Sequence, residues 1–95
     1  MAAYIIGEIE ITDLAGYEAY RPLAAASIAR HGGKYLVRGG AAETLDGAGP
    51  PKRIVALEFA TFAAAKAFYN SPDYQDALKL RLMSSTGRVI VVDGV

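Results

Sequence analysis

The sequence predicts one α+β domain with a four-stranded antiparallel sheet that carries its helices on a single face. Three observations lead to this fold class: isoleucine- and valine-rich runs, helical periodicity between them, and glycine- or proline-rich breaks at the junctions. The predicted order is strand, helix, strand, strand, helix pair, strand. Right-handed connections around one core arrange this order as a ferredoxin-like βαββαβ fold. A chain of 95 residues is expected to form a single domain over 1–95.

The first strand and helix follow from the N-terminal third of the chain. AYIIGEIEI, residues 3–11, reads as a strand rich in isoleucine. Asp13 then stands where a helix N-cap belongs, and HGG at 31–33 ends the helix because glycine readily adopts the left-handed conformation. Pro22 is expected to bend this helix or to start a second helical stretch. A step of 100° per residue places one set of side chains on a common face: Tyr17, Tyr20, Ala24, Ile28 and His31.

The middle of the chain predicts a long β-hairpin, with DGAGPP as its turn and residues 53–59 as its return strand. Gly39-Gly40 is expected inside the first strand, where paired glycines indicate a bulge or a close backbone approach. Both side-chain sets of the return strand are apolar, so both of its faces are expected to be covered. Because the helices cover one face, the other is expected to contact a second copy of the chain in a homodimer.

Two helices and a strand complete the predicted fold. Thr61 can cap the first helix. In NSPDY, Ser71 is a plausible N-cap, Pro72 suits the first helical position and Asp73 complements the helix dipole. GRVIVVDG supplies the fourth strand. The first of these helices is expected to turn three side chains inward: Phe62, Ala65 and Tyr69.

Composition narrows the function classes. Ten acidic and ten basic residues give a formal net charge of zero, and no basic face of the kind that binds nucleic acid is visible. The absence of cysteine excludes disulfides and thiolate chemistry, and one histidine cannot build a multi-histidine metal site, so we expect no metal and no cofactor. No signal peptide or bilayer-spanning run is recognisable. We therefore expect a cytoplasmic protein with no membrane partner.

Arg81 is the most informative candidate for ligand binding. It shares a helical stripe with Tyr74 and Leu78, and a guanidinium cannot lose its charge, so it needs a carboxylate, carbonyls or an anionic ligand there. The more common outcome is structural: the side chain reaches water or pairs with a protein carboxylate. The candidate structural partners are Glu8, Glu58 and Asp93.

Glu58, His31 and Tyr69 are the candidates for proton transfer. A buried Glu58 would have a raised pKa, but an Arg–Glu pair in the sheet is the favoured alternative. His31 would titrate near neutral pH, yet it also lies where it can cap a helix C-terminus, and that role is favoured. Helical tyrosines facing the sheet are usually core residues, although several hydroxyls together predict a polar-lined crevice. The residues expected to bind a ligand there are Arg81, Tyr74, Tyr69, Arg38 and Tyr20.

The motifs HGGKYLVRGG, LDG, RIVALEF, AFYNSPDYQ, LR and VDG together resemble the family catalogued as domain of unknown function 1330. The resemblance covers almost the whole chain and implies a ferredoxin-like protomer of a dimeric α+β barrel, in which two sheets pack face to face. Asp46 stands where this family often has Glu, and Phe68 where it often has Trp. Superfamily relatives include cofactor-free monooxygenases, lactone isomerases and haem proteins, so the fold names no activity.

Two functions therefore remain open. One is a dimeric protein with a small-molecule pocket between helices and sheet, including a cofactor-independent enzyme on a small acidic or aromatic compound. The other is a non-catalytic dimeric structural or ligand-binding module. The interior discriminates between them, because an interior filled by side chains favours the second.

Overall fold

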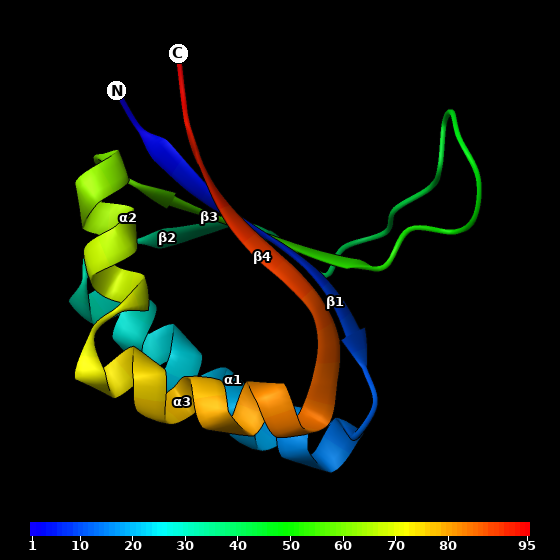
Figure 1. Ribbon diagram of the computed structural model, residues 1–95, viewed down its shortest axis with the longest axis horizontal. Helices are drawn as coiled ribbons and strands as arrows, with labels where there is room; N and C mark the ends of the chain where they lie inside the picture. Colours follow the sequence, from blue (N-terminus) through cyan, green and yellow to red (C-terminus); the bar gives the residue numbers. More distant parts are fainter.

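The computed structural model describes residues 1–95 and confirms the ferredoxin-like α+β fold (Figure 1). Its sheet has the strand order β2-β3-β1-β4, and every neighbouring pair is antiparallel. The helices lie on one face of this sheet. The elements are β1 Ala3–Ile11, α1 Leu14–Arg30, β2 Lys34–Arg38, β3 Arg53–Phe59, α2 Phe62–Tyr69, α3 Pro72–Ser84 and β4 Ser85–Asp93.

Strand β1 lies between β3 and β4, and its side chains alternate between the two faces of the sheet. Its odd-numbered residues from Ala3 to Ile9 are buried and face the helices. Ile5 lies opposite Leu57 and Val91 on this inner face. The outer face, which no helix covers, carries apolar side chains from all four strands: Tyr4, Ile6, Val37, Ile54, Ala56, Ile90 and Val92.

Helix α1 begins and ends as its sequence indicates. The Asp13 carboxylate accepts a hydrogen bond from the amide of Gly16 at 3.3 Å, and His31 is the C-cap. The amide of Gly33 donates to the carbonyl of Ile28 at 2.9 Å, which ends the helix with Gly32 at φ 77°. The helix runs through Pro22 without a break, so the expectation of a second helical stretch is wrong.

Helices α1 and α3 pack side by side in antiparallel directions (Figure 1). The amides of Thr12 and Asp13 donate to the carbonyl of Ser84 at 2.9 and 3.1 Å. A Cβ on Gly16 would lie 3.0 Å from the Ser84 Cβ, so glycine permits this close approach. The contact joins the beginning of α1 to the end of α3.

The N-caps of α2 and α3 are also confirmed. The Thr61 hydroxyl accepts from the amide of Ala64 at 3.0 Å, and the Ser71 hydroxyl accepts from that of Tyr74 at 3.4 Å. Of the three inward residues expected in α2, Ala65 is buried and Tyr69 packs against the core, but Phe62 is 38% exposed. Phe68, which is 1% exposed, faces inward instead. Phe68 stacks on Phe59 with ring centroids 5.0 Å apart and forms the centre of the core.

The hairpin is less regular than the sequence suggests. Strand β2 ends at Arg38, so Gly39-Gly40 lies in the loop and not inside the strand, and the irregularity in pairing falls between Tyr35 and Val37. Gly39 has φ 67°, and a Cβ there would overlap the guanidinium of Arg53, so the expected close approach does occur. The loop 40–52 extends away from the helices (Figure 1). None of the helices is long and apolar enough to cross a membrane.

Candidate functional site

A cavity of about 50 Å³ lies between the inner face of the sheet and the helices. Five tyrosines and four arginines contribute to its wall together with aliphatic side chains. No aspartate, glutamate or histidine lines it. The polar residues of the wall are Tyr17, Tyr20, Tyr35, Tyr69, Tyr74, Arg21, Arg38, Arg53 and Arg81.

Arg81 lies in the last turn of α3 and is only 7% exposed. It forms no ion pair, and its buried Nε donates no hydrogen bond. None of the three expected carboxylate partners reaches it. Glu58 pairs with Lys34 at 3.1 Å and Glu8 pairs with Arg88 at 3.5 Å. A buried cation with no counter-charge beside it is costly, so Arg81 is an unusual feature of this core.

Two tyrosine hydroxyls lie beside this arginine. Those of Tyr20 and Tyr74 are 2.7 Å apart and share a hydrogen bond. Burial raises the pKa of Tyr20, and the adjacent Tyr74 raises it further, so the phenol stays neutral and keeps its proton for donation. Burial lowers the pKa of Arg81, but the oxygens of Tyr74, Tyr20 and Tyr69 outweigh it and the pKa is raised. The pocket therefore combines a permanent positive charge with neutral hydroxyls.

The other three arginines lie around Tyr17 and Tyr35. The guanidinium of Arg53 is 5.7 Å from the Tyr17 ring centroid, and that of Arg38 is 4.2 Å from the Tyr35 ring centroid. Arg21 also faces Tyr17, at 5.4 Å, and pairs with Glu18 at 3.2 Å. Arg53 and Arg21 are absent from the sequence-predicted ligand residues. Alternation in β3 puts Arg53 on the same face as Leu57 and Phe59, and the pairing of β3 with β1 shows that this is the inner face.

The structure brings together all five residues predicted to bind a ligand, since Arg81, Tyr74, Tyr69, Arg38 and Tyr20 all line the cavity. Of the three candidates for proton transfer, only Tyr69 lies there. Glu58 is on the outer face of the sheet, directly opposite its partner Lys34, and is not deeply buried as expected.

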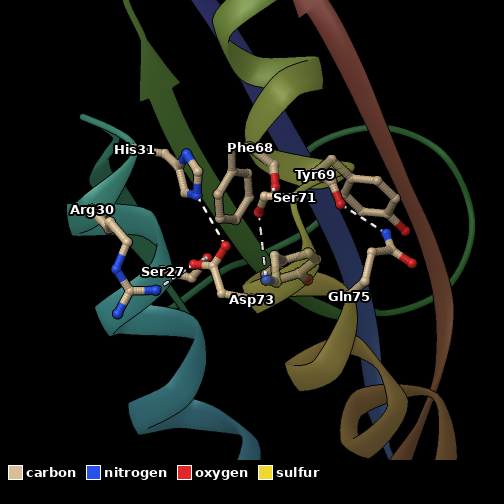
Figure 2. Close-up of polar contacts among 9 residues, drawn as sticks. Ser27, Arg30, His31, Phe68, Tyr69, Ser71, Asp73 and Gln75 are labelled. Carbon is tan, nitrogen blue, oxygen red and sulfur yellow. Dashed lines mark hydrogen bonds and ion pairs between the residues drawn. The ribbon is translucent and has the colours of Figure 1, made fainter.

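His31 is engaged by Asp73 outside the cavity (Figure 2). Asp73 accepts hydrogen bonds from Ser27 at 2.6 Å, from Arg30 at 2.6 Å and from His31 Nε2 at 3.1 Å. The bonds from Ser27 and His31 lower the pKa of this carboxyl below its usual value. The cluster joins the end of α1 to the start of α3, which is a role beyond the dipole contact expected of Asp73. No group of three or more His, Cys, Asp or Glu side chains is placed to hold a metal ion.

A second hollow of about 210 Å³ adjoins the cavity, between α2 and β4. Ile5, Tyr69 and Val89 line both spaces, so the Tyr69 side chain stands at their boundary. Most of the lining of this hollow is apolar. Its size exceeds the roughly 150 Å³ that suffices for benzene, whereas the arginine-lined cavity is smaller than that.

Comparison with known proteins supports the fold and identifies a family. The family described as domain of unknown function 1330 matches residues 2–95. A comparison with curated proteins finds no match.

Solved structures share the architecture at low identity. A protein of unknown function from Rhodopseudomonas palustris, RPA0582, superposes with a TM-score of 0.78 at 18% identity, covering 99% of this chain and 82% of that one. SnoaB, a cofactor-independent oxygenase from Streptomyces nogalater, has a TM-score of 0.63 at 13% identity, covering 99% and 93%. A dimeric protein of unknown function with a ferredoxin-like fold from Bacteroides fragilis has a TM-score of 0.65 at 13% identity, covering 98% and 95%.

Proposed function

The chain belongs to the domain of unknown function 1330 family, and we propose from the geometry of the cavity that it binds a small acidic compound between its helices and its sheet. Arg81 contacts the acid group, and the hydroxyls of Tyr20, Tyr74 and Tyr69 orient it. The observation that carries the proposal is the buried Arg81 guanidinium, which has no protein carboxylate beside it. An arginine buried for structural reasons alone would ordinarily be paired.

The size of the cavity favours small aliphatic acids over aromatic ones. A space of about 50 Å³ holds a carboxylate with a few carbon atoms but not a ring, unless side chains move. Binding in this way replaces the water lost by the guanidinium with a charge-assisted, bidentate contact.

The lining also favours binding over proton-transfer catalysis. The cavity offers no carboxylate and no imidazole, and the raised pKa of Tyr20 keeps its phenol protonated, so that no phenolate is available there to act as a base. A reaction at this site would therefore depend on charge stabilisation by arginine and hydrogen-bond donation by tyrosine. The similarity to SnoaB makes cofactor-independent oxygenation the second candidate, to be assayed on any acid that binds.

Calorimetry with short-chain carboxylates tests the proposal. Wild-type protein is expected to bind acetate or propionate with one site per chain, and Arg81→Met is expected to lose at least about tenfold in affinity while it keeps the circular dichroism of the fold. Lys79→Met is a matched control, since this exposed cation of α3 does not line the cavity. Equal affinities in wild type and Arg81→Met would refute the site and favour the non-catalytic structural module.

The proposed ligand-binding unit is a homodimer that packs its outer sheet faces together. Ile90 is 43% exposed and Val92 is 44% exposed on this face, beside Ile6. A contiguous apolar sheet face is costly in water, and burying it against a second copy removes that cost. The dimeric state of the Bacteroides fragilis neighbour supports this arrangement.

A further inference from the structure

The charges around the cavity are not balanced by one acid group. Four guanidiniums line the cavity, and Glu18 pairs with one of them, Arg21. Arg38 is exposed, so water compensates its charge. Arg53 is half-buried, forms no ion pair, and has a buried Nε without a hydrogen-bond acceptor, as does Arg81. A monocarboxylate held by Arg81 would leave Arg53 without a counter-charge.

Arg53 and Arg81 contact different parts of the same wall. Tyr74, Tyr20 and Tyr69 surround Arg81, whereas Arg53 faces the ring of Tyr17. The rings of Tyr17, Tyr20 and Tyr74 follow one another, with centroid separations of 5.4 and 6.3 Å. One row of aromatic rings thus has an arginine near each end, and the exposed Arg38 stacks on the ring of Tyr35, which also lines the cavity.

We propose that the ligand is a small dicarboxylate, with one carboxylate on Arg81 and the other on Arg53 with help from Arg38. This inference rests on the proposed function and adds the second charge and its contact. Gly39 supports the contact at Arg53, because its missing side chain leaves space for the Arg53 guanidinium. The cavity volume of about 50 Å³ favours a short chain between the two acid groups.

Calorimetry of paired acids tests the second contact. Each acid is titrated into the protein at constant ionic strength, and the affinities of malonate, succinate and glutarate are compared with those of acetate and butyrate. Inorganic phosphate is included as a compact dianion. The affinity of wild-type protein for at least one dicarboxylate is expected to be at least about tenfold higher than for either monocarboxylate. Arg53→Gln is expected to abolish that preference, because it reduces the affinity for dicarboxylates far more than the affinity for acetate. Lys79→Gln, which removes one positive charge away from the cavity, is expected to preserve the preference.

The outcomes separate this inference from the proposed function. Arg53→Lys keeps the charge at the same position and is expected to retain part of the preference, which controls for misfolding of the glutamine variant. Acetate binding that depends on Arg81, without any preference for dicarboxylates or with a preference unchanged in Arg53→Gln, overturns the second contact alone. Tighter binding of phosphate than of every dicarboxylate overturns the two-ended arrangement. Failure of all these acids to bind overturns both proposals.

Discussion

The carboxylate of Asp73 lies 3.1 Å from Nε2 of His31 and joins the first turn of α3 to the C-cap of α1 (Figure 2). Ser27 and Arg30 donate to the same carboxylate, each at 2.6 Å. These bonds stabilise the ionised form, and the pKa of Asp73 is therefore lowered in the folded protein. A pH dependence of stability follows from that shift.

Asp73→Asn should destabilise the protein near neutral pH, and the difference from wild type should shrink as the pH falls. A lowered folded-state pKa contributes stability that is fully present above the unfolded value of 3.8 and is lost as the pH falls toward the folded value. Urea midpoints measured between about pH 7 and about pH 2 check this. Asp76→Asn, on the exposed side of the same helix, is the control and should show little difference at either end. A constant difference across this range would contradict the assignment.

Gly39→Ala should cost roughly 1–2 kcal/mol of unfolding free energy, because an L side chain is strained at φ 67°. The added Cβ would also displace the Arg53 guanidinium, so affinity for dicarboxylates should fall with stability. Chemical denaturation and calorimetry measure the two effects. Gly40→Ala has open space around its Cβ and should change neither by a comparable amount. Equal stability and equal affinity in the two variants would contradict both the strain at Gly39 and its contact with Arg53.

Tyr69→Ala should change the size of acid that the protein accepts. The Tyr69 side chain lines both the arginine-lined cavity and the apolar hollow of about 210 Å³, so its removal connects the two spaces. The affinity of the variant for benzoate is expected to be at least about tenfold higher than that of wild type, because the ring can then occupy the hollow while the carboxylate reaches Arg81. Calorimetry with benzoate measures this gain. The double variant Tyr69→Ala/Arg81→Met should lose it, and benzoate binding that survives there would place the acid elsewhere.

Ile90→Lys should convert the proposed homodimer to monomers. Ile90 lies beside Ile6 on the outer face of the sheet, where a buried lysine without a partner would oppose association. Light scattering at micromolar concentration should give a dimer mass for wild type and about half that mass for the variant. Leu82→Lys, at an exposed position of α3, should remain dimeric. A wild-type protein that is monomeric in this measurement would remove the basis of the proposal.

Local signals predicted the fold well. The caps Asp13, Thr61 and Ser71 depend on neighbours within three residues, and the structure has each of them. Periodicity placed Ala65 and Tyr69 of α2 correctly but named Phe62 instead of Phe68, because a helix of eight residues is too short for periodicity to fix its phase. The phase of α2 depends instead on the contact of Phe68 with Phe59, which lies in β3.

The site was predictable only where helix geometry decides it. Arg81 follows from the spacing of α3, and its lack of a carboxylate partner required knowing where Glu8 and Glu58 point. The inward position of Arg53 required the register of β3, which alternation alone left open between two faces. The contact of His31 with Asp73 joins residues 42 positions apart, and no local pattern reports such a pair.

The hydrogen bonds that join α1 to α3 at both ends have a mechanical consequence. Ser84 holds one end of the helix pair through the amides of Thr12 and Asp13, and Asp73 holds the other end. Because the two helices are joined at both ends, we expect them to move as one rigid body, and a tilt of the pair away from the sheet would widen the cavity. An acid that bridges Arg81 on α3 and Arg53 on β3 opposes this tilt. Binding should therefore slow amide hydrogen exchange along α1, including turns that the ligand does not contact.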